Sequence, residues 1–583
     1  MAMPVAARSA VVWSRTRISL SSVCAVGLLL FVAFLTLLPV AMVVYASFNA
    51  GSPMRPRGFT LDGYTAIFTS ARNLEATWTS LWLAAVRTAT SVGIATFLAW
   101  VVARTDTPLR RLLHFVVIVK FFMPPLAFIA GWMLLAAPKS GFINVTLQNF
   151  LPFVDGPVLD IFSAGGVIAV STFASVPIWF MILLPAFTQM DASFEESSRM
   201  CGVGPIATFF RVTLPLIAPA VFAVVLLSLI HWLETFDTEI FLGAPAGLYV
   251  ISTVVYEYVH QSTPAKYPPA MAFSTLLMVL TALLVFIYWL RVTSKQYRYT
   301  TVTGRGYAVR PIRLGRWKYV TLGLVLLYFF VSTLLPGFFV LIGPFMKYAG
   351  VFAGDWFTMD HWKLATTPQA LASFKNSLLL GFFSATGGAL LYTLVSYLAL
   401  RTKYGWRGWL EFMTWLPFAM PGIVLALGLL WVYVGTIQLP FLVMYGTVQM
   451  LVLACIIKRM PTGVRTVNGV TIQISKELEE ASRVHGASWL YTFTRIFIPL
   501  LWPGIVSVWL LTAVLSIKEL VIILMLYSAP TMTLAVYFFQ LATDRSQLSR
   551  ALILSMLELG LIMLFWVAAK LLSRRGGGVA AGM

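Results

Sequence analysis

Long apolar segments constrain this chain more than any other feature. Runs of 18 or more mostly apolar residues recur along it, and each can cross the hydrocarbon core of a bilayer. Of the 583 residues, 59% are hydrophobic and 11% are charged, which is too little charge to cover a water-soluble protein of this size. The sequence lacks the ten-residue alternating segments of a membrane β-barrel. It therefore predicts an all-α polytopic membrane protein.

About twelve spans are expected, six on each side of a basic linker. They cover residues 18–44, 78–103, 112–137, 163–189, 212–236 and 271–290, then 319–346, 376–400, 408–434, 440–457, 497–525 and 551–572. Residues 291–318 hold eight Lys and Arg residues and no acid. We therefore divide the chain into a first six-helix unit (1–290), a cytoplasmic linker (291–318) and a second six-helix unit (319–583).

The two halves are internal repeats. Thr36-Leu37-Leu38-Pro39 recurs 297 positions later as Thr333-Leu334-Leu335-Pro336. The same offset relates Ser80 to Ser377, Arg104 to Arg401, and Met123-Pro124 to Met420-Pro421. Because each half has an even number of spans, both enter the membrane in the same direction, as parallel repeats. Pro124, Pro125 and Pro421 are expected to break their helices.

The distribution of basic residues predicts the orientation. With the N-terminus inside, 28 of the 41 Lys and Arg residues fall in internal segments and nine in external loops. Both termini are therefore predicted to be cytoplasmic. The net charge of +20 follows from this topology and gives no reason to expect nucleic-acid binding.

The chain shows no sequence pattern of enzymatic chemistry. Cys24, Cys201 and Cys455 are isolated, and the five histidines are scattered. No phosphate-binding loop, zinc-protease motif or nucleophile elbow occurs. We expect no enzyme activity, no metal site and no cofactor in this chain.

A polar segment recurs between the fourth and fifth spans of each half. Its members are Glu196-Ser197-Ser198, Gly202 and Pro215 in the first copy, and Glu480-Ala481-Ser482, Gly486 and Pro499, all 284 positions later, in the second. Acids near its start predict a short helix. Ser193 with Glu196 has the spacing of a capping box, and Ser475 is a candidate N-cap. The glycine should allow a sharp turn, and the proline should mark the start of the next span.

This pattern resembles the cytoplasmic Glu-Ala-Ala loop motif of permease subunits of binding-protein-dependent ABC importers. The first copy departs at Ser197 and Ser198, and the second at Ser482. The whole chain resembles the fused two-unit permeases typified by ferric-iron uptake systems. The resemblance implies a bacterial inner-membrane protein whose motif residues Glu196, Gly202, Glu480 and Gly486, with Ser197, Ser198, Ala481 and Ser482, couple to two ABC ATPases. It also implies that the partners use ATP and that an external solute-binding protein delivers the solute.

Ionisable residues inside spans are candidates for the translocation path or a gate. Glu234 and Lys518 occupy equivalent positions, 284 residues apart, and Asp237, Glu239 and Glu519 are close by in the sequence. We hypothesise that Glu234 and Lys518 face each other across the path; alternatively, they meet water at the ends of their spans. The equivalents of Arg87 and Lys120 are the uncharged Ser384 and Pro417. Arg87 and Lys120 would suit an anionic solute on the path, or would snorkel or pair with carboxylates.

The predicted function is that of a permease importing ferric iron. Related permeases leave thiamine, polyamines, phosphonates and sulfate-like anions as alternative solutes. An ATP-independent secondary transporter is the alternative class, because such proteins also have twelve spans in parallel halves. That class does not need two matched polar motifs, and a structural or signalling protein does not need the charges inside the spans.

Overall fold

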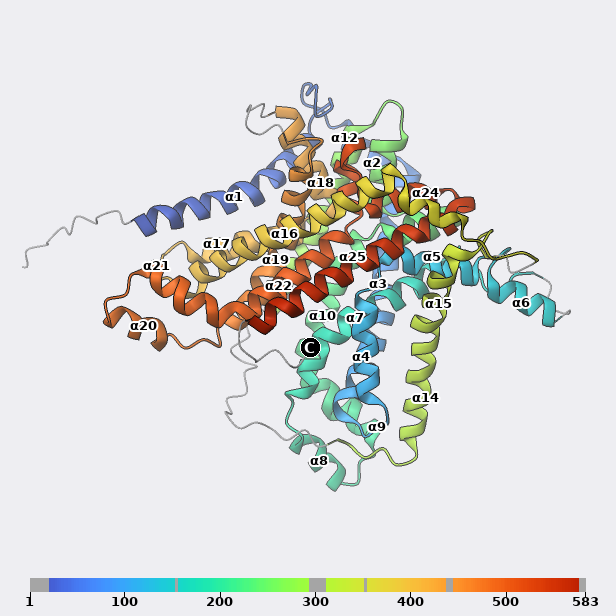
Figure 1. Cartoon of the computed structure of the whole chain (residues 1–583), viewed down its shortest axis with the longest axis horizontal. Helices are drawn as coiled ribbons and strands as arrows, with labels where there is room; N and C mark the ends of the chain where they lie inside the picture. Colours follow the sequence, from blue (N-terminus) through green and yellow to red (C-terminus); the bar gives the residue numbers. More distant parts are fainter. Residues whose placement is uncertain (1–19, 152–155, 293–310, 351–353, 437–443, 576–583) are drawn as a thin grey trace, which may run out of the picture.

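The computed structural model describes residues 20–151, 156–292, 311–350, 354–436 and 444–575. Within these ranges it contains nine helices that are long and apolar enough to cross a membrane, or up to twelve if each of three bent pairs counts as one span. Figure 1 shows the helices packed as one body. The prediction of an all-α polytopic membrane protein is confirmed.

The helices of the two halves follow the same order. The first half contains α1 (Leu20–Ser47), α2 (Asp62–Thr69), α3 (Ala71–Arg104), α4 (Arg110–Phe121), α5 (Pro125–Ala136), α6 (Phe142–Phe150), α7 (Ala164–Thr188), α8 (Ser193–Met200), α9 (Pro205–Thr208), α10 (Leu214–Glu234), α11 (Ile251–Tyr256) and α12 (Tyr267–Arg291). The second contains α14 (Trp317–Phe329), α15 (Leu335–Ile342), α16 (Pro368–Arg401), α17 (Arg407–Trp415), α18 (Gly422–Leu430), α19 (Val448–Thr471), α20 (Glu477–Val484), α21 (Trp489–Thr492), α22 (Ile498–Ile517), α23 (Val521–Leu526), α24 (Leu534–Thr543) and α25 (Leu548–Arg575). Most of the predicted linker and residues 440–443 lie outside the described residues.

The first helix of each half crosses to the other half. Helix α1 packs against α17 and α18 of the second half as well as α12 of its own half, and α15 packs against α5 of the first half, so each first helix crosses to the opposite half (Figure 1). Two glycines permit this close packing. A Cβ atom on Gly131 would lie 2.6 Å from the backbone oxygen of Pro336, and one on Gly428 would lie 2.8 Å from that of Pro39. Both contacts obey the 297-residue repeat, so the two crossings are equivalent.

The predicted helix breaks at the prolines are confirmed. Helices α4 and α5 meet at 105° beside Pro124, and the helical segments 407–419 and 422–434 meet at 105° beside Pro421. Proline lacks an N–H group and clashes with the preceding turn, so the chain bends where it occurs. The structure adds a third bent pair that the sequence did not predict, Glu239–Ala246 with Ile251–Gln261, at 95°.

The tenth predicted span, 440–457, is displaced in the structure. Helix α19 runs from Val448 to Thr471 and therefore carries Lys458 and Arg459 in its middle. The predicted span ended at residue 457, which left both residues in the cytoplasmic segment that follows it. Here both charges are paired with carboxylates, which removes the reason for the helix to stop.

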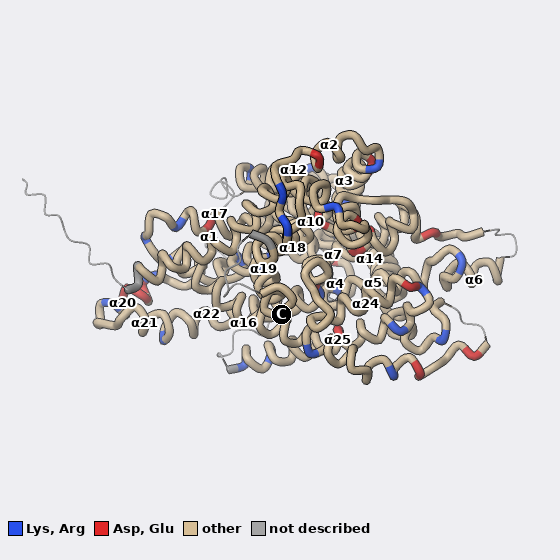
Figure 2. The backbone as a smooth tube through the Cα atoms, turned by 90° about the horizontal axis from the view of Figure 1, so that it is seen from above, with Lys and Arg blue, Asp and Glu red and all other residues tan. Residues whose placement is uncertain are grey.

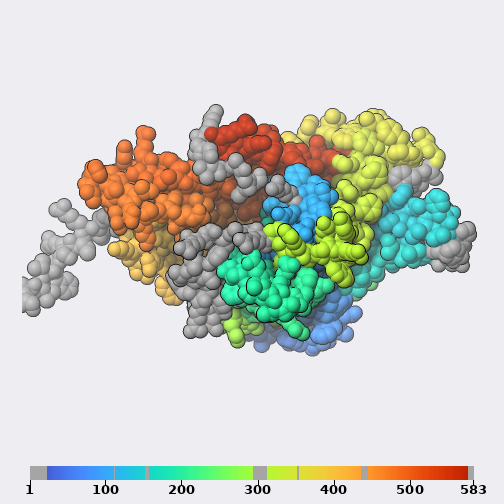
Figure 3. Space-filling view, turned by 90° about the horizontal axis from the view of Figure 1, so that it is seen from below, coloured from blue at the N-terminus to red at the C-terminus, as the bar shows by residue number. Residues whose placement is uncertain are grey.

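Helices α8 and α20 lie on separate arms of the molecule. Figure 1 places α8 at the lower end and α20 at the left end. Figure 2 shows acidic and basic residues gathered at α20, near one end of a molecule whose backbone is mostly uncharged elsewhere. The green region near residue 200 and the orange region near residue 480 are both visible from below in Figure 3.

Candidate functional site

The two motif helices begin in the same way. The Oδ1 atom of Asp191 accepts a hydrogen bond from the backbone N–H of Ser193 (2.9 Å), and Oγ of Ser475 accepts one from that of Glu477 (3.2 Å). Asp191 and Ser475 are related by the 284-residue offset. The predicted N-cap Ser475 is displaced by one residue, because Lys476 occupies the N-cap position of α20 and Ser475 binds the first N–H of the helix from the position before it. The predicted capping box of Ser193 is wrong, because α8 already begins at Ser193 and the side chain of Asp191, before the N-cap residue Ala192, binds the first N–H of the helix.

Both helices end at a glycine in the left-handed region. Gly202 and Gly486 each have φ of 79°. The next residue closes the turn in both halves, since Val203 N–H donates to Ser198 O (3.2 Å) and Ala487 N–H to Ser482 O (3.1 Å). The predicted sharp turn is confirmed, and only glycine adopts this backbone without strain.

We predict that Gly486→Ala destabilises this turn by about 1–2 kcal/mol, because a Cβ atom is disfavoured at positive φ. Limited proteolysis should then cut the 486–492 segment faster than in wild type. Gly469→Ala is the matched control, since Gly469 lies within α19 and its Cβ would meet nothing within 4 Å. Equal cleavage of the two variants would contradict the prediction.

Each motif divides into an exposed side and a side that braces the turn. Glu196, Ser197, Glu480 and Ala481 are exposed. The third motif residue points inward: Ser198 Oγ lies 3.0 Å from Thr208 Oγ1, and Ser482 Oγ lies 2.8 Å from Thr492 Oγ1. These hydrogen bonds hold α8 on α9 and α20 on α21. We call α8–α9 (193–208) and α20–α21 (477–492) the docking elements.

The motif prolines lie at the starts of α10 and α22, but inside the longer continuous spans Pro205–Glu234 and Trp489–Ile517. Helices α9 and α21 continue into α10 and α22 through five-residue π-helical turns, Phe209–Thr213 and Phe493–Phe497. Pro215 and Pro499 follow directly at the second residue of α10 and of α22. A π-turn changes the hydrogen-bond register, so the missing proline N–H does not end the helix. The expected start of the span at these prolines is therefore corrected.

A buried ion pair lies beneath each docking element, and the sequence analysis missed both pairs. Arg104 binds Glu195 through a hydrogen bond from Nε to Oε2 (2.9 Å) and a second from its Nη2 group. The exposed fractions of these side chains are 0% and 2%. Arg401 and Glu479 form the equivalent pair, with Nε 3.5 Å from Oε1. The sequence did carry a signal for these pairs, because Arg104 recurs as Arg401 at an offset of 297 and Glu195 recurs as Glu479 at an offset of 284.

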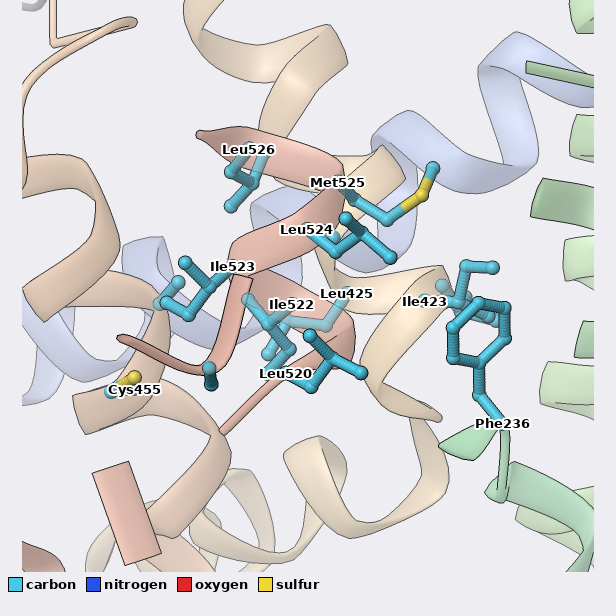
Figure 4. Packing of buried hydrophobic residues seen from close by; sticks show 14 of the residues in the cluster. Phe236, Ile423, Leu425, Cys455, Leu520, Ile522, Ile523, Leu524, Met525 and Leu526 are labelled. Atoms are coloured by element: carbon cyan, nitrogen blue, oxygen red, sulfur yellow. The ribbon is translucent and has the colours of Figure 1, made fainter. Parts of the chain in front are cut away.

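The fifth spans both stop near the centre of the molecule. Helix α10 ends at Glu234 and α22 ends at Ile517, and each is followed by a short irregular segment. Phe236 and Leu520, which are 284 residues apart, are each 1% exposed. Figure 4 shows both among apolar side chains of the second half, including Ile423. Side chains of the two halves therefore fill the interior at this level.

Glu234 and Lys518 each contact the opposite half, but not each other. Glu234 forms an ion pair with Lys458 of α19, and the Lys458 ammonium also donates to Met420 O (3.2 Å). Lys518 donates to the backbone oxygen of Phe121 at the end of α4 (2.7 Å). The hypothesised pair is thus replaced by two separate contacts between the halves.

The remaining candidates are also largely internal. Arg87 forms a buried ion pair with Glu239, and Glu519 pairs with Arg459. Among the described residues, Asp237 Oδ1 and the Lys120 ammonium are buried without a hydrogen-bond partner. Lys120 instead lies 4.8 Å from the ring centre of Phe128. The sequence analysis missed Lys458, Arg459 and Glu239 as partners, because residues on different helices meet only through packing.

No group of three or more His, Cys, Asp or Glu side chains suitable for a metal ion occurs in the described ranges. The charges at the centre are arranged mainly as ion pairs between helices. Such an arrangement can hold two halves in a defined relation and can be rearranged when the halves move.

Two segments match one protein family. Residues 91–299 and 392–575 fit the profile described as "Binding-protein-dependent transport system inner membrane component". The two matches fall in the two halves of the chain, as expected for a fused repeat.

Several curated proteins are similar over much of the chain. The ferric transport system permease protein FbpB of Actinobacillus pleuropneumoniae is 25% identical over 70% of this chain, and the putative ferric transport system permease protein FbpB 1 of Haemophilus influenzae is 26% identical over 69%. This chain spans 58% and 62% of their respective lengths. The spermidine/putrescine permease PotB of Escherichia coli is 26% identical over 40% of this chain and 82% of its own. A crystal structure of a bacterial alginate ABC transporter overlaps 42% of this chain and 84% of its own, with 19% identity and a TM-score of 0.34.

Proposed function

Because this chain belongs to the family of binding-protein-dependent transport system inner membrane components, we propose that it is the permease subunit of an ATP-driven importer. In this proposal each docking element binds one cytoplasmic ABC ATPase, and the chain lies in a bacterial inner membrane with both termini in the cytoplasm. An external solute-binding protein delivers the solute. The chain itself carries out no chemistry and holds no cofactor.

One observation carries the proposal: two surface helices of the same design recur on separate arms. Each presents an exposed carboxylate, Glu196 or Glu480, on a short helix fixed from behind by a buried ion pair. An exposed, rigid helix suits docking into a groove on a partner. Two equivalent docking elements suit two equivalent partners, so one fused chain would bind two ATPases.

The central contacts suggest how the path is closed in this conformation. Phe236 and Leu520 would form an apolar barrier, and Glu234–Lys458 and Lys518–Phe121 would hold the halves together around it. Closure of the two ATPases around ATP would move the docking elements, and the halves would then rock and exchange these contacts. Glu234, Asp237, Lys518, Glu519, Lys120 and Arg87 are proposed to line or gate the path.

Ferric iron is the proposed solute. Its support is the similarity to two proteins named as ferric transport permeases, over about 70% of this chain. The similarity to a polyamine permease supports the runner-up, a small organic cation. In either case the external binding protein is proposed to select the solute.

The proposal is tested by purifying the chain from native membranes after mild crosslinking and identifying its partners by mass spectrometry. Glu196→Arg/Glu480→Arg should reduce the co-purified ATPase at least about tenfold, because each reversal opposes a charge complement at an interface. Glu75→Arg/Asp360→Arg is the control, since both acids are exposed and lie outside the docking elements. Metal analysis of the co-purified binding protein then tests the choice of iron.

Absence of any ATPase with wild-type protein would refute the importer proposal and favour an ATP-independent secondary transporter. An ATPase retained equally by the double variant would show that the docking elements are not its site.

A further inference from the structure

We infer that α3 and α16 are levers that carry movement of the docking elements to α11 and α24, the short helices that follow the fifth spans, and that Arg104 and Arg401 are the positioning residues that attach the docking elements to these levers. This inference rests on the proposed function, because it concerns how ATPase movement would reach the path. It assigns the transmission of this movement to α3 and α16, two helices that lie outside the Glu-Ala-Ala motif.

The attachment at the docking end is the same in both halves. Arg104 and Arg401 are the last residues of α3 and α16. Besides pairing with Glu195, Arg104 donates from Nη1 to Met190 O (3.1 Å) at the end of the preceding span. Arg401 donates from Nη2 to the equivalent carbonyl, Ile474 O. Each guanidinium thus joins three elements: the lever, the preceding span and the docking helix.

The carboxylates of Glu195 and Glu479 each accept a further hydrogen bond from another side chain. Glu195 accepts a hydrogen bond from Thr213 Oγ1 (2.6 Å), at the base of the fifth span. Glu479 accepts one from Tyr397 of α16 (3.4 Å), whose hydroxyl also accepts a hydrogen bond from Trp489 of α21 (3.0 Å). Separating a buried carboxylate from its charged partner is strongly unfavourable. A docking helix that moves should therefore take the end of its lever with it.

Towards its other end, each lever holds a short helix that follows the fifth span, α11 in the first half and α24 in the second. Ser80 Oγ of α3 accepts a hydrogen bond from the backbone N–H of Ile251, the first residue of α11 (2.9 Å). Ser377 Oγ of α16 accepts one from that of Leu534, the first residue of α24 (2.9 Å). In the first half, Arg87 adds the buried ion pair to Glu239. Tyr258 also donates to Asn73 Oδ1 (2.9 Å), and Asn376 Nδ2 donates to Pro530 O (2.9 Å), so each lever holds this region at more than one point.

The levers are long and uninterrupted. Exactly 24 positions separate Ser80 from Arg104, and Ser377 from Arg401, a helical distance of about 36 Å. Both helices have 34 residues and no proline beyond the first turn. By contrast, α7, α10, α19 and α22 all contain interior prolines. A helix without a kink transmits a displacement of its end with the least bending.

The test uses the full complex with its ATPases and external binding protein in proteoliposomes, and measures solute transported per ATP hydrolysed. Arg104→Gln/Arg401→Gln removes the guanidinium charge from the end of each lever and leaves the docking elements unchanged. We expect normal ATPase binding and an approximately tenfold lower transport per ATP, within the usual range of coupling between sites. Asp360→Asn, which breaks an exposed ion pair with Lys363, should leave this ratio unchanged.

A milder variant keeps the test valid if removal of both charges prevents folding. Ser80→Ala/Ser377→Ala loosens the other ends of the levers and should also lower transport per ATP while sparing ATPase binding. Wild-type transport per ATP in both variants would overturn the inference. Loss of ATPase binding in the glutamine variant would also overturn it, because the pairs would then only shape the docking surface. If wild-type protein binds no ATPase, the proposed function itself fails.

Discussion

Replacing Lys458 with glutamate is expected to abolish transport and to lower the yield of folded protein. The side chains of Lys458 and Glu234 are 12% and 22% exposed, so their ion pair is largely screened from water. Breaking a buried pair typically costs about 3–5 kcal/mol, and the residual exposure places this one near the lower end of that range. The substitution also sets two carboxylates against each other across the boundary between the halves.

The reciprocal exchange, Glu234→Lys/Lys458→Glu, should recover most of the folded yield, because it restores opposite charges at the same place. Size-exclusion profiles and uptake assays on the two single variants and the double variant form a complete cycle. A matched exchange of Glu234 and Lys518 should show no recovery, since these residues do not pair. Recovery in the second exchange but not in the first would contradict the structure.

Gly131→Ala/Gly428→Ala is expected to separate the exchanged first helices from the halves that they cross. The new Cβ atoms would lie 2.6 Å and 2.8 Å from the backbone oxygens of Pro336 and Pro39, and backbone cannot move aside as a flexible side chain can. Overpacking of this kind costs about 1–3 kcal/mol at each site. The melting temperature in detergent should fall clearly, and the aggregated fraction should rise.

Gly27→Ala/Gly560→Ala is the control for the same chemical change. Neither of these Cβ atoms would meet anything within 4 Å, so alanine should be neutral or slightly stabilising in these helices. If the two double variants melt at the same temperature, the close crossings in the structure are wrong.

Together these contacts give the fused chain a physical rationale. Helices α1 and α15 cross to the opposite half, and Glu234 and Lys518 also contact the opposite half. The docking elements instead attach within their own halves, through Arg104 and Arg401. The halves are therefore interlocked near the centre, and each docking element is attached within its own half, which suits a rocking movement about the centre.

The sequence by itself determined the class, the repeat and the motifs. Membrane spans are readable because lipid requires long apolar helices. Asp191, Gly202 and their counterparts Ser475 and Gly486 act through backbone turns, so short-range patterns largely determined these features. Even here, the sequence analysis chose Ser193 instead of Asp191 as the residue that binds the start of α8, because that choice depends on where the helix begins.

Tertiary structure decided which charges meet. Equivalent positions suggested that Glu234 pairs with Lys518, but symmetry relates the positions without placing them in contact. Packing brings Lys458 to Glu234, Arg87 to Glu239 and Arg104 to Glu195, over separations of 224, 152 and 91 residues. An ion pair depends on distance in space, and the sequence records distance only along the chain.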